Sequence, residues 1–377
     1  MPDSAQVPEI LRYSVFGGEA PEITDWPATI RELNRQALAP MAFIRGFASV
    51  YTSTIAKEHY RNFGNLTEQC EVIRELNGLL DCPVVLKGLA AAQYYPRPNR
   101  RTVGDLDIIA HGTEFARAVE ILEGAGFVPT EARRKKLSET RHRAYTRLGV
   151  CIELHQYFSL GKTDRDHRLD RIIAEAVPVR RTVNNCEFYC LPDPVNGLAL
   201  LEHLTHHLSD GVGLRHVLDW ACYVRAYLTD EAWETELRPL AEATGLDLLA
   251  AAVTALTEKY LGAPHRAFAA AADDETVDLM MEEFLSAGNM GRGRGETAGR
   301  IASFRGDRNP LRRLQRGGLA RWRFAWDHKW VRPFAWLYQL LRILWHLLTK
   351  KDRSGAGIIY RRQDRIFRAL HLGKYMK

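Results

Sequence analysis

The stretch from Cys82 to His111, CPVVLKGLAAAQYYPRPNRRTVGDLDIIAH, constrains the fold of this chain more than any other. Its first five residues form a short apolar run rich in valine, which predicts a buried strand over Cys82 to Leu86. An alanine-rich segment with helical spacing begins at Gly88, and Pro96 to Pro98 ends it. The run from Asp105 to Ile109 predicts a second strand. We therefore expect a strand, a tight turn into a helix, and then another strand.

Two aspartates share one face of the second strand. Because side chains alternate between faces, Asp105 and Asp107 point the same way while Leu106 and Ile108 point into the core. Two carboxylates on a half-buried sheet repel each other unless a cation neutralises them, so removing one should not destabilise the metal-free protein. Their oxygens suit Mg²⁺ or Mn²⁺. The backbone N–H groups and helix dipole at the Gly88 turn suit a phosphate. Metal and phosphate together indicate phosphoryl or nucleotidyl transfer.

A third carboxylate is available from a later strand. The segment from Gly149 to Tyr157, GVCIELHQY, alternates so that Cys151, Glu153 and His155 share a face. Glu153 is therefore the candidate for the third metal-binding acid.

These motifs occur in a characteristic order along the chain: LKG, YPxPxxR, DLD and IELH. In that order the chain resembles the uncharacterised nucleotidyltransferase family of bacterial biosynthetic clusters, a divergent branch of the polymerase-β-like superfamily. The resemblance extends from near Trp26 to near Tyr227. It implies an α+β fold, with a small mixed β-sheet palm-like catalytic domain, N-terminal helices and a C-terminal helical domain.

The resemblance also implies a two-metal reaction. An acceptor hydroxyl would attack the α-phosphate of a nucleoside triphosphate, and pyrophosphate would leave. Asp105 and Asp107 would hold two Mg²⁺ (or Mn²⁺) ions about 3.5–4 Å apart. Glu153 would bind the metal nearer the acceptor and help to accept its proton.

Three further residues are expected to contact the triphosphate or to support the acids. Lys87 and the N–H groups at Gly88 would hold phosphate oxygens. Arg101 matches the arginine that precedes DxD in the family, and it would be a second phosphate contact or a brace for the carboxylates. The chain departs from the wider superfamily in having Lys-Gly in place of Gly-Ser after the first strand, and glutamate in place of aspartate as the third acid.

The length and composition set the domain organisation. A chain of 377 residues with 46% apolar and 26% charged residues is typical of a globular protein with two or three domains. We expect an N-terminal arm (to about residue 24) and helical lead-in over 1–80, and the catalytic domain over 81–191. A helical domain would cover 192–285 and a basic, tryptophan-rich helical region 286–377. Helices are expected at about 194–209, 214–228, 231–243 and 247–261.

The net charge, the cysteines and the targeting signals bear on the binding partners of the protein and on its cellular compartment. The net charge of +6 fits anionic substrates, nucleic acid or an anionic membrane surface. Cys186 and Cys190 lack a second pair, so reduced thiols are expected rather than a zinc ribbon. The sequence shows no secretory signal, and the apolar segment from Trp330 to Leu348 is interrupted by polar residues. We expect a cytoplasmic protein, with peripheral association at the inner face of the membrane as the alternative.

The helical domain carries four histidines, at His203, His206, His207 and His216. They lack the His-Glu-x-x-His order of metalloproteases, because Glu202 precedes the first of them, so we expect packing and hydrogen bonding rather than metal ligation. Arg215 and Asp219 lie one helical turn apart and are expected to pair.

Two basic segments have more than one interpretation. Residues 129–143 suggest a solvated loop or strand edge, and a basic flap over a triphosphate is the alternative. Residues 311–353 interleave tryptophans with basic residues. A helical layer packed on the body is the favoured interpretation, adsorption to an anionic membrane surface is the second, and nucleic-acid binding is the third.

Three classes of function follow from these patterns. The first is a nucleotidyltransferase acting on a small molecule, sugar, lipid-linked intermediate or peptide. The second is a toxin-like nucleotidyltransferase that modifies tRNA, and the third is a non-catalytic scaffold that retains the fold. Because all three acids are present, the enzyme is favoured over the scaffold.

Overall fold

The computed structural model describes residues 6–43, 52–130, 137, 140–159, 163–208, 211–291, 328–349 and 353–372. Its centre is one mixed sheet with the strands β1 (Cys82–Leu86), β2 (Leu106–His111), β3 (Val128–Pro129), β4 (His142–Arg147), β5 (Val150–His155), β6 (Val179–Val183) and β7 (Cys186–Cys190). The strand order is β3-β4-β5-β2-β1-β7-β6. The α+β fold with a small mixed sheet is thereby confirmed.

The centre of the sheet brings three site positions into line. β2 pairs antiparallel with β1, with Leu86 opposite Asp107, and parallel with β5, with Asp107 opposite Glu153. β1 pairs in parallel with β7 on its other side. Because the predicted strands 82–86, 105–109 and 149–157 are neighbours, their polar ends converge at the same edge.

Helices precede the sheet, connect its strands and follow it. The N-terminal and sheet-domain helices are α1 (Gln6–Phe16), α2 (Trp26–Arg35), α3 (Thr52–Leu79), α4 (Gly88–Ala92), α5 (Phe115–Gly124) and α6 (Asp164–Glu175). The later helices are α7 (Asp193–His207), α8 (Leu214–Ala226), α9 (Asp230–Ala232) with its continuation α10 (Arg238–Thr244), α11 (Asp247–Leu256), α12 (Asp274–Ala287), α16 (Arg332–Thr349) and α17 (Arg353–Ala369). The four helical segments expected over 194–261 are present within a few residues of their predicted bounds.

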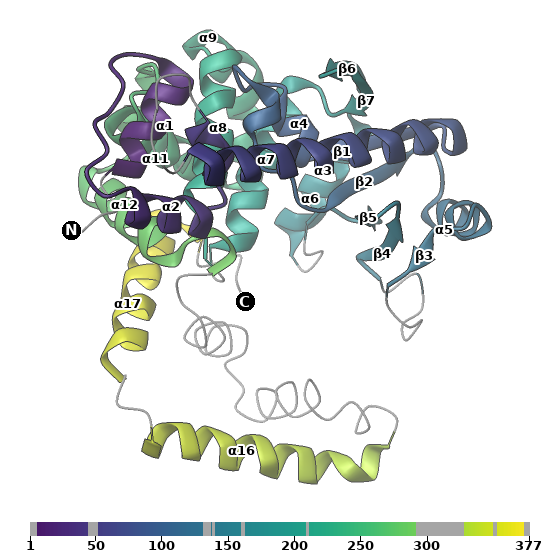
Figure 1. Ribbon diagram of the computed structural model, residues 1–377. Coiled ribbons are helices and arrows are strands. Elements are labelled where there is room, and N and C mark those ends of the chain that lie inside the picture. The colour runs from purple at the N-terminus through teal and green to yellow at the C-terminus, as the bar shows by residue number, and fades with distance from the viewer. Residues whose placement is uncertain are drawn as a thin grey trace.

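The two faces of the sheet belong to different cores, and β1 shows the division. Val85 packs with α3 and α5 in one cluster of buried side chains, whereas Val84 and Leu86 pack with α1 and the helical domain in the other. Figure 1 shows the long α3 lying across the sheet, with the helical domain to the left of the strands. The edge of the sheet at which the polar strand ends converge therefore faces the helices α7 and α8, which are called the helical wall below.

The N-terminal segment differs from the irregular arm that the sequence suggested. Residues 6–16 form α1, and Val7, Ile10 and Leu11 are fully buried. These positions follow the i, i+3, i+4 spacing of a helix face, but the helix is short and Pro8 lies near its start, so local preference alone does not reveal it. The arm is thus part of the helical core.

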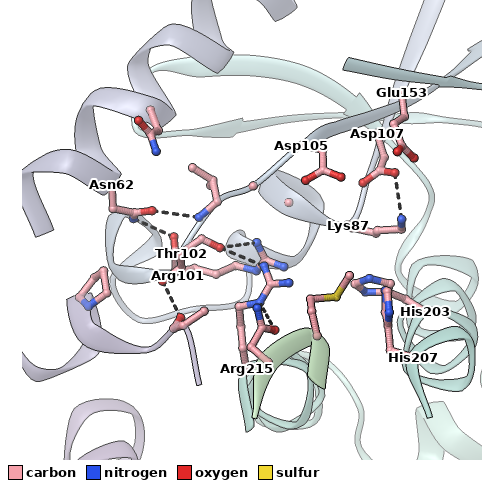
Figure 2. Close-up of a pocket in the computed structure, with 18 of the residues that line it drawn as sticks. Asn62, Lys87, Arg101, Thr102, Asp105, Asp107, Glu153, His203, His207 and Arg215 are labelled. Carbon is pink, nitrogen blue, oxygen red and sulfur yellow. Dashed lines mark hydrogen bonds and ion pairs between the residues drawn. The ribbon is translucent and has the colours of Figure 1, made fainter. Parts of the chain in front are cut away.

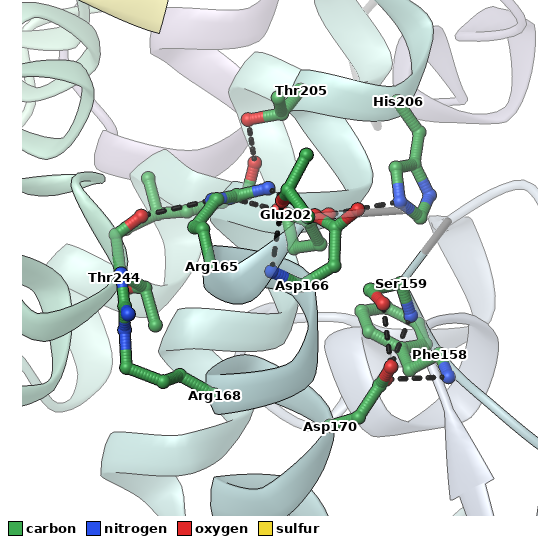
Figure 3. A network of polar contacts seen from close by, with 12 residues as sticks. Phe158, Ser159, Arg165, Asp166, Arg168, Asp170, Glu202, Thr205, His206 and Thr244 are labelled. Atoms are coloured by element: carbon green, nitrogen blue, oxygen red, sulfur yellow. Dashed lines mark hydrogen bonds and ion pairs between the residues drawn. The ribbon is translucent and has the colours of Figure 1, made fainter. Parts of the chain in front are cut away.

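A buried polar network joins the sheet to the helical domain (Figure 3). Arg165 of α6 donates from Nε to the carbonyl oxygen of Thr244 at 2.9 Å and pairs with Glu202 of α7. Asp170 accepts hydrogen bonds from the backbone N–H groups of Phe158 and Ser159 at 3.0 and 2.9 Å. The segment that leaves β5 is therefore fixed to α6, and α6 is fixed to the helices.

The two C-terminal helices differ in how they pack. Ile366 and Phe367 of α17 and Leu370 just after it are buried in the main core, and Gln363 of α17 donates to Glu283 of α12 at 2.8 Å. α16 lies apart from the body in Figure 1. Its apolar side chains Phe334, Leu337, Tyr338, Leu340 and Leu341 are all at least 40% exposed. Trp322 and Trp326 of the predicted tryptophan stripe lie outside the described residues.

The described helices were also compared with the length and apolarity of a membrane span. None of them alone is both long enough and apolar enough to span a membrane. The two segments 230–244 and 247–261, which are bent relative to each other, meet the two criteria together, by length and composition only.

Candidate active site

A cavity of about 850 Å³ lies between the edge of the sheet and the helical wall. All six site residues predicted from the sequence line it: Lys87, Gly88, Arg101, Asp105, Asp107 and Glu153. The rest of the lining comes from α2 and the segment after it, α3, the loop before Asp105, the start of β4, α7, α8 and residues 289–290. Its volume is at the upper end of the range for ligand pockets, about 300–1,000 Å³, and leaves room for a nucleotide and a second substrate.

Asp107 is buried, and two basic side chains neutralise the negative charge of its carboxylate. Lys87 Nζ lies 2.9 Å from Asp107 Oδ1 (Figure 2), and His155 Nε2 lies 2.8 Å from the same oxygen. Burial alone would raise the pKa of Asp107, but Lys87 and His155 outweigh it and hold the pKa well below its usual range. The expectation of an uncompensated acid pair in the metal-free protein is therefore wrong, because Lys87 already supplies the cation.

Lys87 reaches Asp107 from an unusual backbone conformation. Its φ is +51°, a region that side chains with a Cβ seldom adopt, at a cost of about 1–3 kcal/mol. The residue ends β1 and precedes α4, so this turn is the predicted strand-to-helix junction. From this turn the ammonium group reaches the carboxylate of Asp107 and lines the cavity.

Asp105 differs from Asp107 in its exposure and in its contacts. It is exposed in the cavity, and its carboxylate makes no ion pair or hydrogen bond with the residues that the structure describes. The loop before it is held by α3: Asn62 bonds the backbone of Asn99, Arg101 and Val103, and Gln69 donates to the carbonyl oxygen of Gly104. Asp105 is thus a free carboxylate on a fixed backbone, which suits a metal ligand.

Arg101 is engaged away from the acids. Its guanidinium makes a two-pronged ion pair with Asp219 of α8, both contacts at 2.7 Å, and Tyr95 Oη donates to the same carboxylate at 2.7 Å. All three side chains are buried. Of the two roles expected for Arg101, the geometry favours the brace, although what it braces is the loop against α8.

The expected ion pair between Arg215 and Asp219 is absent from the described contacts. Arg215 instead donates to the carbonyl oxygen of Thr102 at 3.3 Å and to Asn289 at 3.3 Å. Both arginines therefore hold the same loop, which ends at Asp105.

Glu153 lies beside two histidines that motif reasoning did not place in the site. His155 Nε2 is 3.3 Å from Glu153 Oε2, and His142 Nε2 is 3.8 Å from Glu153 Oε1. The hydrogen bond from His155 lowers the pKa of Glu153, so this acid stays ionised at neutral pH. The signal for His155 was its position two residues after Glu153 on the same strand face.

The residues present fit a divalent cation. Asp105 is a free carboxylate, Asp107 lies across the strand pair from Glu153, and oxygen donors of this kind suit Mg²⁺ or Mn²⁺. His142, Glu153 and His155 also place three donor atoms within 4.8 Å of one another, a mixed set that suits softer cations.

Part of the basic segment 129–143 belongs to the sheet and not to a loop. Arg143 is buried in β4, and Arg141 lines the cavity while donating to the carbonyl oxygen of Phe158 at 2.8 Å. Residues 131–136 and 138–139, which carry the other basic side chains of the expected flap, lie outside the described residues.

Comparison with known proteins agrees with this geometry. The family model described as "Uncharacterised nucleotidyltransferase" matches residues 23–262, which include the sheet, the three acids and the helical wall. No curated protein and no solved structure matches the chain. Since the matched region is more than half of the sequence, the chain belongs to the uncharacterised nucleotidyltransferase family.

Proposed function

We propose that this protein transfers a nucleoside monophosphate from a nucleoside triphosphate to an acceptor hydroxyl, with Mg²⁺ or Mn²⁺ as cofactor. One observation carries the proposal: Asp105, Asp107 and Glu153 converge with Lys87 in a single cavity. Family membership supports nucleotidyltransferase activity in general. The acceptor would be a small molecule, sugar, lipid-linked intermediate or peptide made in a bacterial biosynthetic pathway, in the cytoplasm where triphosphates are available.

Each residue has a distinct part in the proposed reaction. Glu153 accepts the proton of the acceptor hydroxyl as its oxygen attacks the α-phosphorus, and the bond from that phosphorus to the leaving pyrophosphate breaks. Lys87 binds phosphate oxygens and offsets their charge. Asp105 and Asp107 orient the divalent cation, which supplies Lewis-acid stabilisation of the charged transition state.

Asp105 allows a test that does not disturb the fold. Because its carboxylate has no partner among the described residues, Asp105→Asn should leave the apo stability almost unchanged. The wild-type protein with Mg²⁺ and its preferred triphosphate should be stabilised by about 2.7 kcal/mol at 100 times Kd. Asp105→Asn should lose most of this gain. Thermal denaturation with each of the four ribonucleoside triphosphates, with Mg²⁺ or with EDTA, measures it.

The matched control is Asp164→Asn, which changes an exposed aspartate outside the cavity. That variant should keep the full ligand-dependent shift. An unchanged melting temperature of the wild type with every triphosphate at millimolar concentration would remove the basis for the proposal.

We also propose that α16 adsorbs to an anionic membrane surface. Phe334, Leu337, Tyr338 and Leu341 follow the i, i+3, i+4, i+7 spacing of one face of α16, Trp330 lies in the 3-10 turn just before it, and each of the five is at least 43% exposed. Such a stripe in a basic segment is typical of a helix that lies in the membrane interface.

The membrane proposal predicts salt-sensitive binding of the full-length protein to vesicles that contain phosphatidylserine. Replacing both Phe334 and Leu341 with serine should weaken this binding about a hundredfold or more, because each of these apolar side chains contributes about 1.5 kcal/mol or more when buried in lipid. Phe63→Ser, at a similarly exposed apolar position on α3, should have no effect. Vesicle co-sedimentation provides the measurement, and equal binding by all three proteins would contradict the assignment to α16.

A further inference from the structure

Three histidines form a compact cluster in the helical wall of the same cavity. His203 and His207 lie one turn apart on α7, and His216 comes from the start of α8. Their ring centroids are 4.8, 4.9 and 5.2 Å apart, and one ligand nitrogen from each lies within 4.8 Å of the other two. His203 and His207 line the cavity, on the side of Lys87 away from the carboxylates (Figure 2). The cluster is thus separate from the acids but opens to the same space.

Three of the six ring nitrogens of this cluster lack the hydrogen-bond partners that buried polar atoms usually have. His216 is 4% exposed and His203 7%. Within the part of the chain that the structure describes, Nδ1 of His207 and the two ring nitrogens of His216 have no hydrogen-bond partner of good geometry, and the only hydrogen-bonding group that acts on the His216 ring is a backbone group of Gly213. Buried polar groups without partners destabilise a fold, so several of them in one cluster indicate that a ligand binds there.

The protonation state of the cluster also suits metal binding. Burial lowers the pKa of His207 to about 3, with the charge of Lys87 as the next cause. Burial likewise lowers the pKa of His203 and of His216 well below the usual value. Neutral imidazole is the form that binds metal ions. The charge of Lys87 opposes a second cation, but its ion pair with Asp107 offsets much of that effect.

We propose that His203, His207 and His216 bind a transition-metal ion of the Zn²⁺ class, at a site distinct from the carboxylate site. Imidazole nitrogens favour such ions over Mg²⁺, which prefers oxygen. Zinc–nitrogen bonds of about 2.0–2.1 Å require nitrogens about 3.3 Å apart, so the rings would close by at most about 1.5 Å.

Three protein ligands leave one position of a tetrahedral ion open. Because His203 and His207 line the cavity and the buried His216 does not, we expect the open position to face the cavity. It would bind water or an anionic oxygen of the bound substrate. This last role rests on the proposed transferase function, whereas metal binding itself does not.

Titration of the chelator-treated full-length protein with Co²⁺ tests the site. We expect one Co²⁺ bound by nitrogen ligands, seen in visible absorption and calorimetry, and displaced by Zn²⁺ but not by millimolar Mg²⁺. His207→Ala and His216→Ala should each weaken this binding more than a hundredfold. If His216→Ala fails to fold, His207→Ala, at a partly exposed position, still decides the question.

Two kinds of control variant show which site gives the Co²⁺ signal. His265→Ala removes an exposed histidine of the helical domain and should not change Co²⁺ binding. Glu153→Gln alters the mixed His142, Glu153 and His155 group and should also leave the three-nitrogen signal intact. No Co²⁺ or Zn²⁺ bound by the wild type, or a signal lost in Glu153→Gln but kept in His207→Ala, would overturn the site. Neither result depends on triphosphate binding, so failure of this proposal is distinguishable from failure of the transferase proposal.

Discussion

Replacing Asp107 with asparagine should weaken the binding of a Mg²⁺-bound nucleoside triphosphate about a hundredfold and also destabilise the apo protein. The loss of affinity follows because a charged ligand of the cation is removed, and about 2.7 kcal/mol corresponds to that factor. The loss of stability follows because the largely buried Lys87 loses its anionic partner, and the buried His155 keeps only Glu153. We expect the free energy of unfolding to fall by about 1–3 kcal/mol.

Calorimetry with Mg²⁺ and the triphosphate measures the first effect, and urea denaturation in EDTA measures the second. Glu153→Gln is the matched comparison, since Glu153 is 25% exposed and its proposed role is nearer the acceptor. That variant should lose transfer while it retains more of the nucleotide affinity and stability. An Asp107→Asn protein that is at least as stable as the wild type in EDTA would contradict the compensation by Lys87 and His155.

Asp219→Asn should cause the largest loss of stability, about 3–5 kcal/mol. The substitution removes the only charged partner of Arg101 among the described contacts, and both side chains are 2% exposed, so a buried guanidinium would be left unpaired. Tyr95 and Arg101 would also have to share the single remaining side-chain oxygen at this position as their acceptor. Because this pair holds the loop that ends at Asp105, triphosphate affinity should fall as well.

Urea denaturation of Asp219→Asn and Glu234→Gln provides the comparison. Glu234 also pairs with an arginine, but both partners are about half exposed, so its loss should leave the unfolding midpoint unchanged. Similar midpoints for the two variants would show that the Arg101–Asp219 pair contributes no more than a surface pair.

The acids and the strands that carry them could be predicted from the sequence. Alternating apolar residues identify β2 and β5, and the same alternation places Asp107 and Glu153 on one face. Their convergence could be predicted as well, because an ordered set of motifs matched a known family.

The partners of these residues could not be predicted, since they are distant in sequence. Arg101 and Asp219 are 118 positions apart, and the nearer Arg215 appeared to be the partner from helix spacing alone. Lys87 and Asp107 are 20 positions apart, so the neutralising cation was assigned to a metal and not to the protein. Strand β4 was missed because its buried position 143 is an arginine, which hides the alternation of apolar residues.

The three-histidine cluster could not be predicted from the sequence for the same reason. His203 and His207 have the spacing of one helix face, but the third member comes from the next helix, after a turn. Sequence order therefore favoured simple packing, whereas the fold brings the three rings to within about 5 Å of one another.

The position of the transferred label tests the central claim most directly. The wild-type protein, Mg²⁺ and a small-molecule extract would be incubated with a nucleoside triphosphate labelled at either the α- or the γ-phosphate. Nucleotidyl transfer predicts that α-label is incorporated into an acceptor, that γ-label is released as pyrophosphate, and that Asp105→Asn abolishes both. Incorporation of γ-label, or no label transferred from either position with any of the four triphosphates, would contradict the assignment of Asp105, Asp107 and Glu153 as a nucleotidyltransferase site.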